Sequence, residues 1–268
     1  MRRAERAPRA NATGADPTNL IWVMPAEGGR SPNVSRPLAG RLERFMRAVI
    51  FANGHFPDPS GHRHLLHPGD LLIAADGGCV HARAAGVTPH VVIGDLDSLE
   101  PALQAELAAA GTRFVPHPAE KDETDLELAL LYAVEQGATE IVVLAALGGR
   151  LDQTLANLLL LSHPALADVD VRLVEGAQTA FLVRNWARIV GEPGDTVSFV
   201  PLGGDARGVT AIGLRWSLRE ETLRFGQTRG ISNVLVEREA HVRVREGVVL
   251  CVVTAMKHDD EWTMNNDQ

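Results

Sequence analysis

The chain has 268 residues, of which 45% are hydrophobic, so it is long enough for one large or two modest domains with real cores. Its formal net charge of −8 argues against an extended nucleic-acid or membrane-surface footprint, which would show as clustered Lys and Arg in excess. No apolar run approaches the roughly 18 residues of a membrane span, and the N-terminus lacks the apolar core of a signal peptide. We therefore expect a cytoplasmic protein that binds neither nucleic acid nor membrane. Its two cysteines, Cys79 and Cys251, are expected to be reduced core residues.

Residues 1–45 are rich in Arg, Ala, Pro, Gly and Asn without a sustained apolar period, which predicts a disordered extension. From Ala48 onward, apolar runs of strand length alternate with helical periods. The predicted strands are AVIFANG, LLIAADGG, HVVIGDLDS, TRFVPH and EIVVLAALGG, and the helices between and after them are CVHARAAG, PALQAELAAAG, TDLELALLYAVEQG and DQTLANLLLLS. This alternation predicts an α/β domain over residues 46–167, with a mostly parallel, Rossmann-like sheet and helices on both faces.

Beyond about residue 168 the helical period fades, and runs such as DTVSFVPL and GVTAIGL are typical of strands. A two-residue alternation over 242–245, followed by Glu246 and Gly247, predicts a β-hairpin. We therefore expect a second, all-β domain over residues 168–258, followed by a frayed tail over residues 259–268.

A pair of carboxylates, Asp95 and Asp97, follows the buried run VVIG with one leucine between them. One interpretation is a solvated turn with a Ser98 cap and Pro101 in the first turn of the next helix. The other is a divalent cation such as Mg²⁺, which takes oxygen ligands and reverses the repulsion between the two charges. If the backbone stays extended, both side chains point the same way and reach one metal ion.

Another strand end carries the motif AADGG, in which Asp76 precedes Gly77 and Gly78 at the start of a helix. Adjacent glycines let a ligand approach the backbone and the helix N-terminus closely. The same motif is also compatible with an ordinary turn.

The segment KDETDLELAL opens a predicted helix, because Thr124 and Glu127 have the spacing of a capping box. Asp122 and Asp125 either favour the positive end of the helix dipole or join the aspartate pair at the same sheet edge. Lys121 is interpreted either as a phosphate contact or as a solvated side chain.

The segment LGGRLDQ places Gly148 and Gly149 after a strand and Arg150 and Asp152 before a helix. Arginine suits phosphate oxygens, and the neighbouring aspartate can orient it, bind metal or accept a proton. The alternative is a glycine loop with Asp152 as the helix N-cap.

Together, four carboxylate or glycine clusters at four strand ends predict a metal cage and a phosphate clamp at one sheet edge. This combination is hard to reconcile with four unrelated turns. A metal-clamped polyphosphate is the interpretation that explains why Asp95 and Asp97 are neighbours.

The motifs ADGG, GDLDS, KDETD and GGRLDQ, followed by GLRWSL, LRFG and GISN, resemble those of the thiamine pyrophosphokinase family in the same order, from about Ala48 to Met256. The resemblance implies an α/β domain joined to a C-terminal β-sandwich. It also implies a homodimer with active sites at the subunit interface, in which the pyrophosphoryl group of ATP passes to thiamine with Mg²⁺, releasing AMP. Many bacterial members look like RxDH where this chain has Asp152-Gln153, and others carry Gln, so the departure leaves the expected catalysis intact and the local contact open.

By this resemblance, Asp95, Asp97 and Asp125 are the metal and catalytic carboxylates, and Arg150 and Asp152 complete the phosphate site. The expected ATP-binding residues are Asp76, Gly77, Gly78, Lys121, Asp122, Gly148, Gly149 and Arg150. Ser232 and Asn233 are expected in the thiamine pocket. Trp216 and Phe225 either contact the ligand or pack in the core or an interface. Asp97 and Asp152 are the candidates for the group that takes the alcohol proton.

Two other functions remain open from the sequence. Asp95 and Asp97 also match the D-x-D of a haloacid-dehalogenase-type phosphatase, although convincing downstream Ser/Thr and Lys partners are missing and the β domain would go unexplained. A non-catalytic module that binds nucleotide or thiamine is the third possibility. Release of AMP from ATP and thiamine discriminates among the three.

Overall fold

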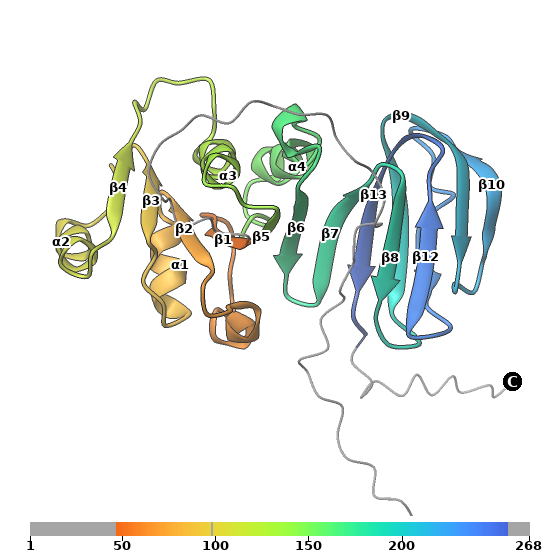
Figure 1. Ribbon diagram of the computed structural model, residues 1–268, viewed down its shortest axis with the longest axis horizontal. Coiled ribbons are helices and arrows are strands. Elements are labelled where there is room, and N and C mark those ends of the chain that lie inside the picture. Colours follow the sequence, from red (N-terminus) through yellow and green to blue (C-terminus); the bar gives the residue numbers. More distant parts are fainter. Residues whose placement is uncertain (1–46, 98, 257–268) are drawn as a thin grey trace, which may run out of the picture.

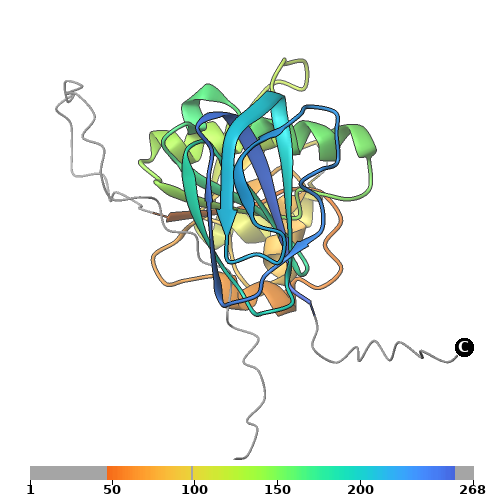
Figure 2. The same ribbon diagram turned by 90° about the vertical axis from the view of Figure 1, so that its right-hand side faces the viewer.

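The computed structural model describes residues 47–97 and 99–256, and it has a mixed α/β fold built on a large sheet (Figure 1). Thirteen strands are connected by pairing, in the order β4-β3-β2-β1-β5-β6-β7-β13-β9-β12-β8, with β10 and β11 paired to β9. Helices accompany the N-terminal half, and the C-terminal half consists of strands and loops (Figures 1 and 2). The predicted segments 1–45 and 259–268 lie outside the described residues.

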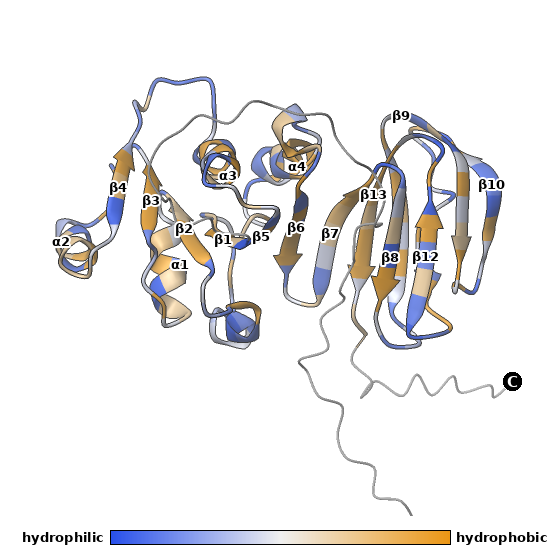
Figure 3. Cartoon of the chain, viewed as in Figure 1, coloured by the Kyte–Doolittle hydropathy of each residue, from blue (hydrophilic) through white to orange (hydrophobic). Residues whose placement is uncertain are grey.

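The N-terminal strands are parallel. They are β1 (Arg47–Phe51), β2 (Leu71–Ala75), β3 (Val91–Gly94), β4 (Arg113–Pro116), β5 (Glu140–Leu144) and β6 (Asp170–Glu175). The strand centres are hydrophobic, whereas the loop between β4 and the next helix is hydrophilic (Figure 3). Because parallel strands share a direction, their carboxyl ends meet at one edge of the sheet.

Helices cover both faces of the parallel strands, as predicted. They are α1 (Gly78–Ala84), α2 (Pro101–Ala109), α3 (Asp125–Glu135) and α4 (Leu151–Leu160), with short 3₁₀ helices at η1 (Ser60–Leu65) and η2 (Pro164–Leu166). Successive residues of β1 point to opposite faces: Ile50 packs in a core that includes Leu130 of α3, and Val49 packs in one that includes Ala82 of α1. This two-sided burial explains why the strands are continuous apolar runs.

The C-terminal strands are β7 (Gln178–Val183), β8 (Trp186–Val190), β9 (Thr196–Ile212), β10 (Leu218–Leu223), β11 (Asn233–Val234), β12 (Glu239–Arg243) and β13 (Glu246–Thr254). Their pairings are antiparallel. Alternate residues of these strands form a separate core, which includes Phe181, Phe199 and Cys251. The predicted boundary at residue 168 falls just before β6, which pairs in parallel with β5 and antiparallel with β7.

The predicted hairpin over 242–247 is wrong. β12 and β13 both pair antiparallel with β9, and not with each other. The runs DTVSFVPL and GVTAIGL, predicted as two strands, are parts of this one 17-residue strand. β12 and β13 follow each other along β9: the pairs of β12 with residues 210–212 continue in the same register as the pair of Glu246 with Arg207, and a bulge follows before Val248 pairs with Leu202. Local alternation is the same for either pairing, so it could not reveal this arrangement.

Within residues 47–97 and 99–256, no helix is long and apolar enough to cross a bilayer. Both cysteines are buried and unbonded, as predicted.

Candidate active site

A cavity of about 900 Å³ lies at the carboxyl ends of the parallel strands. It collects residues that follow β1, β2, β3 and β5, together with the first turns of α3 and α4. Its lining includes seven residues predicted from the sequence, namely Asp76, Asp95, Lys121, Asp125, Gly148, Gly149 and Arg150. Gly77, Gly78, Asp97, Asp122 and Asp152 were also predicted for this site, and they lie outside the lining.

Gly78 was predicted to let a ligand approach the backbone, but in the structure it allows close packing between a helix and a strand. A Cβ at this position would lie 1.9 Å from the carbonyl oxygen of Phe51, so only glycine lets α1 begin this close to the end of β1. Gly148 lines the cavity in the left-handed region, at φ +78°, where a side chain would also meet His55. The glycine pairs thus shape the turns that bring strand ends and helix starts together.

The aspartate pair is held by a turn rather than by strand alternation. β3 ends at Gly94, and Leu96 adopts a left-handed conformation at φ +64°, so the backbone is not extended through the pair, which was the condition for alternation to align the two side chains. The amide of Asp97 donates a hydrogen bond to Oδ1 of Asp95 at 3.2 Å. This folds the two carboxylates onto each other as in an Asx turn. The left-handed conformation of Leu96 therefore brings the carboxylates of Asp95 and Asp97 close together, without the alternation of side chains along an extended strand.

The charges around Asp97 are unfavourable in the absence of a cation. Its side-chain interaction with Asp95 raises the pKa of Asp97, and the negative charges of Asp95, Asp76 and Asp125 raise it further. A carboxyl whose ionisation is opposed by three acidic neighbours is suited to a site that a divalent cation completes.

The start of α3 agrees with the sequence prediction. The hydroxyl of Thr124 accepts a hydrogen bond from the amide of Glu127 at 3.2 Å, which caps the helix. Asp125 follows in the first turn, and its Oδ1 lies 2.8 Å from Nζ of Lys121. Lys121 is thereby held at the cavity wall, whereas Asp122 is exposed and outside the lining.

Arg150 and Asp152 form a two-bond ion pair at the start of α4. Nη2 and Nε of the arginine donate to the two carboxylate oxygens at 2.5 and 3.2 Å. These bonds lower the pKa of Asp152, with the Arg150 hydrogen bond as the largest cause. Arg150, not Asp152, occupies the N-cap position, so the N-cap alternative for Asp152 is wrong. The aspartate orients an arginine that lines the cavity.

Six polar residues of the lining were not predicted as site residues: Asn53, His55, Glu123, Thr124, Gln153 and Asn157. Asn53 and His55 follow β1, so the strand-end rule applied to AVIFANG would have found them. Asn157 is a buried polar residue on α4, and its Nδ2 donates to the carbonyl oxygen of Ala146 at 2.6 Å. An asparagine within an apolar helical run was the available signal for it.

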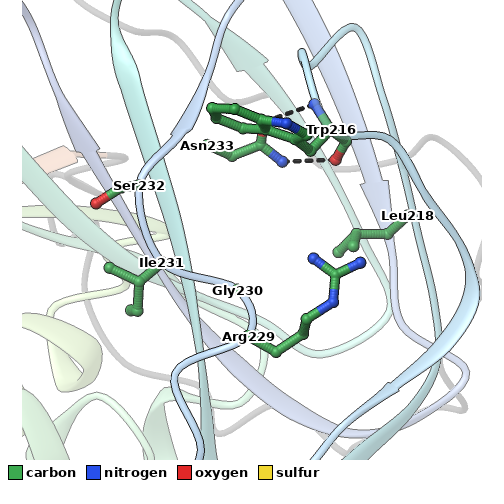
Figure 4. A pocket seen from close by; sticks show the side chains of 7 residues that line it. All are labelled: Trp216, Leu218, Arg229, Gly230, Ile231, Ser232 and Asn233. Atoms are coloured by element: carbon green, nitrogen blue, oxygen red, sulfur yellow. Dashed lines mark hydrogen bonds between the residues drawn. The ribbon is translucent and has the colours of Figure 1, made fainter.

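A second, smaller cavity of about 290 Å³ lies in the C-terminal half, between the loop before β10 and the loop before β11 (Figure 4). It is lined by Trp216, Leu218, Arg229, Gly230, Ile231, Ser232 and Asn233, so all three residues predicted for thiamine are here. The Trp216 side chain is 52% exposed, which agrees with its interpretation as a ligand contact better than with core packing. Phe225 is also exposed and is absent from the lining.

Ser232 and Asn233 differ in their environment. Ser232 is exposed, and its hydroxyl points away from Leu218 and Arg229 in Figure 4. Asn233 is buried, and its amide forms two hydrogen bonds with the backbone of Trp216 (Figure 4). The guanidinium of Arg229 pairs with Glu221 at 3.0 Å, which offsets its positive charge beside this cavity.

The donor chemistry of the large cavity fits Mg²⁺, because Asp95 and Asp125 on its wall and Asp97 beside it offer carboxylate oxygens. Among the residues that the structure describes, however, no three His, Cys, Asp or Glu side chains form a ready-made metal cage. Mg²⁺ commonly binds through one or two carboxylates together with waters and substrate phosphates. The arrangement therefore fits a metal ion that binds along with a polyphosphate.

Comparison with known proteins finds a family match in each half of the chain. Residues 62–173 match the family described as "Thiamin pyrophosphokinase, catalytic domain", and residues 188–249 match "Thiamin pyrophosphokinase, vitamin B1 binding domain". The chain belongs to the thiamine pyrophosphokinase family. Neither the phosphatase nor the non-catalytic alternative is favoured by these two matches to the thiamine pyrophosphokinase family.

Individual relatives agree with this membership. Thiamine pyrophosphokinase from Bacillus subtilis is 28% identical over 184 residues, which cover 68% of this chain and 86% of the relative. Thiamine pyrophosphokinase 3 from Oryza sativa is 26% identical over 180 residues, covering 63% and 67% respectively.

Solved structures of the family share the fold. The crystal structure of thiamine pyrophosphokinase from Bacillus subtilis superposes with a TM-score of 0.71 at 27% identity, covering 79% of this chain and all of that one. The corresponding protein from Geobacillus thermodenitrificans has a TM-score of 0.70 at 27% identity, with coverage of 80% and 99%. Yeast thiamin pyrophosphokinase, at 17% identity and a TM-score of 0.66 over 80% of this chain and 87% of that one, shares the fold.

Proposed function

We propose that the protein is a thiamine pyrophosphokinase, which transfers the pyrophosphoryl group of ATP to the hydroxyl of thiamine to give thiamine diphosphate and AMP. The observation that carries this proposal is that each matched family region holds its own cavity. The vitamin B1 binding match contains the whole lining of the small cavity, and the catalytic match contains most of the lining of the large one. One site for the phosphate donor and one for the acceptor are what a transferase of this kind needs.

ATP is assigned to the large cavity, with its polyphosphate near the start of α3 and α4. Lys121 and Arg150 are the cationic side chains of the lining, and both are already oriented by aspartates. Phosphate oxygens would compete with Asp125 for Lys121 and would meet the guanidinium plane of Arg150. The turn at Gly148 and Gly149 leaves space for the phosphates to approach the backbone.

Asp95, Asp97 and Asp125 are proposed to hold Mg²⁺. When bound, the metal ion would neutralise charge on the polyphosphate and relieve the repulsion among these carboxylates. Without a cation, an ATP polyphosphate would face Asp76, Asp95, Glu123 and Asp125 on the same wall, which would oppose its binding.

In the reaction, the hydroxyethyl oxygen of thiamine attacks the β-phosphorus of ATP. The bond from that phosphorus to the oxygen bridging the α- and β-phosphates breaks, and AMP leaves with this oxygen. The hydroxyl proton passes to a nearby carboxylate, for which Asp97 and Asp152 are the candidates. Positioning and charge neutralisation supply most of the catalysis in such in-line transfers.

Thiamine is assigned to the small cavity, where the exposed indole of Trp216 offers a π surface to an aromatic cation. The pairing of Arg229 with Glu221 reduces repulsion of that cation. Ser232 and Asn233 complete the proposed pocket.

The two cavities share no lining residue and belong to different halves of the chain. We infer that a homodimer brings the small cavity of one subunit to the large cavity of the other. Leu151, Leu155 and Leu159 are spaced four residues apart on α4 and are 81%, 56% and 44% exposed, which is an apolar face for a second copy to cover. In this proposal, a Rossmann-like unit over residues 46–167 and a β-sandwich over residues 168–258 provide the two parts of each site in a cytoplasmic enzyme.

The test is an incubation of the purified protein with ATP, Mg²⁺ and thiamine, in which AMP is resolved from ADP. Stoichiometric AMP and thiamine diphosphate are expected, with no product when Mg²⁺ is replaced by EDTA. Formation of ADP and thiamine monophosphate would contradict pyrophosphoryl transfer. Binding of both ligands without AMP release would support the non-catalytic alternative, and a phosphoaspartyl species trapped by a metal fluoride would support the phosphatase alternative.

A further inference from the structure

The hydrogen bonds of Asn233 are directed at the chain itself. Its Oδ1 accepts from the amide of Trp216 at 3.0 Å, and its Nδ2 donates to the carbonyl oxygen of Trp216 at 2.7 Å (Figure 4). The same Oδ1 accepts from the amide of Val234 at 2.9 Å. With 6% of the residue exposed, three of the four hydrogen bonds that an asparagine side chain can make are already formed within the chain.

The loop between β9 and β10 is attached to β11 and the residues that follow it. The amide of Arg215 donates to the carbonyl oxygen of Val234 at 2.9 Å, Leu214 forms a bridge with Leu235, and the amide of Val236 donates to the carbonyl oxygen of Gly213 at 3.1 Å. With Asn233, these contacts attach four consecutive loop residues, 213–216. The Trp216 backbone is hydrogen-bonded by the side chain of Asn233, whereas the residues before it contact the backbone of the facing segment.

The indole of Trp216 is not held by burial. The residue is 52% exposed, and the guanidinium of Arg215 lies 5.7 Å from the ring centroid as a cation–π neighbour. The rotamers open to an exposed aromatic ring depend on its backbone dihedrals. The contacts that hold the Trp216 backbone therefore restrict where the indole can lie at this wall of the small cavity.

We propose that Asn233 is a positioning residue for the acceptor pocket, which holds Trp216 in place through its backbone and influences thiamine binding through that indole instead of by contact. This inference rests on the proposed function. It reassigns Asn233 from the predicted set of direct thiamine contacts, in which Ser232 and Trp216 remain as proposed contacts.

A double-mutant cycle tests this assignment. Asn233→Ala is expected to raise the thiamine KM about tenfold, because two hydrogen bonds to the Trp216 backbone are lost. The ATP KM should change less than about twofold. In a Trp216→Ala background, the same Asn233→Ala change should raise the thiamine KM by less than about twofold, since the group through which it acts is already gone.

Ser232→Ala is the matched control, because it alters the neighbouring residue of the same loop. Its effect on the thiamine KM should be retained in full in the Trp216→Ala background, as expected for an independent contact. An Asn233→Ala effect that is equally large with and without Trp216, or no effect in either background, would overturn the positioning role.

A spectroscopic measurement separates this inference from the proposed function. With Trp22, Trp186 and Trp262 replaced by Phe, Trp216 is the only tryptophan, and its fluorescence anisotropy reports the motion of the indole without substrate. Asn233→Ala should lower that anisotropy while Ser232→Ala leaves it unchanged. An unchanged anisotropy in Asn233→Ala would refute the inference, whereas lowered anisotropy in a protein that makes no AMP would refute the proposed function alone.

Asn233→Asp keeps the test decisive if Asn233→Ala fails to fold. It retains the oxygen that accepts from the Trp216 amide but replaces the group that donates to the Trp216 carbonyl oxygen. Its anisotropy should fall and its thiamine KM should rise. In the Trp216→Ala background, the rise in the thiamine KM should again be absent. A wild-type KM and anisotropy in Asn233→Asp would count against the proposal.

Discussion

Lys121 and Asp125 face each other across the start of α3, with Nζ and Oδ1 2.8 Å apart at the wall of the large cavity. A proposed phosphate contact and a proposed metal ligand thus neutralise each other when neither ligand is bound. Binding of a metal–polyphosphate complex would exchange this pair for a Lys–phosphate and an Asp–metal contact.

Replacing Lys121 by Met removes the phosphate contact and keeps most of the side-chain volume. We expect the ATP KM to rise about tenfold while the thiamine KM changes little, because the lost charge-assisted bond belongs to the donor site. Arg83→Met is the control, since Arg83 is an exposed cation on α1 that pairs with Glu106 on α2 at 3.2 Å. Steady-state kinetics with each substrate varied in turn provide the measurement. Equal changes in both KM values would contradict the assignment.

Replacing Asp97 by Asn should reduce kcat by on the order of 100-fold or more at saturating Mg²⁺, because a proposed metal ligand loses its charge. Stability without Mg²⁺ should be unchanged or slightly higher, since repulsion with Asp95 is relieved. Glu135→Gln, at the exposed end of α3, is the control for loss of a carboxylate. Near-normal turnover of Asp97→Asn would disprove its role.

The raised pKa of Asp97 also predicts a pH dependence of stability. A carboxyl whose folded pKa exceeds its unfolded pKa contributes stability while protonated, and this contribution is lost as pH rises through the folded pKa. The metal-free Tm difference between Asp97→Asn and wild type should therefore grow from about pH 4 to pH 7, in favour of the variant. Thermal melts in EDTA across this range measure it. A difference that shrinks with rising pH would show that the carboxylate is stabilised in the fold.

Gly78→Ala should destabilise the fold by about 2 kcal/mol, the usual range for overpacking, because the new methyl meets the backbone carbonyl of Phe51 and has no flexible neighbour to displace. Gly204→Ala is the matched control, because no heavy atom lies within 4 Å of its added Cβ. Urea denaturation of both variants gives the comparison. If Gly78→Ala is as stable as Gly204→Ala, the close approach of α1 to β1 is not required.

The proposed homodimer predicts complementation between variants that are impaired in different cavities, assayed at a thiamine concentration well below the KM of the Trp216→Ala chain. Chains with Asp97→Asn keep an intact small cavity, and chains with Trp216→Ala keep an intact large cavity. Once subunit exchange has been demonstrated with tagged chains, the mixture should regain up to about a quarter of wild-type activity, because half of the dimers are mixed and each has one intact site. Mixed dimers without recovery would exclude a shared site.

The leucine face of α4 gives a second test of the dimer. Leu155→Glu should shift the protein toward the monomer in sedimentation velocity and lower its specific activity at low protein concentration. Val80→Glu is the control, since Val80 is a similarly exposed apolar residue, at 55%, on α1. An unchanged sedimentation coefficient in Leu155→Glu would place the interface elsewhere.

Local patterns were sufficient for most elements of the parallel half. The continuous apolar runs of β1, β2, β3 and β5 and the 3.6-residue periods between them depend on neighbouring residues alone. The Thr124 cap is likewise a contact between residues three positions apart. Because strand ends of a parallel sheet share one edge, the order of the motifs along the chain was enough to bring Asp76, Asp95, Asp125 and Arg150 to one cavity.

Only the tertiary structure decided how these residues act, because their partners are distant in sequence or depend on backbone conformation. The left-handed Leu96 folds Asp97 onto Asp95, whereas strand alternation would align the two side chains only on an extended backbone. Asn233 bonds the backbone of Trp216, 17 positions away, and β12 and β13 both pair with β9 instead of forming a hairpin with each other. The periodicity of apolar residues shows which side of a helix or strand is buried. Strand order and the hydrogen-bond partners of polar atoms depend on long-range contacts, and one periodicity is compatible with several arrangements of these contacts.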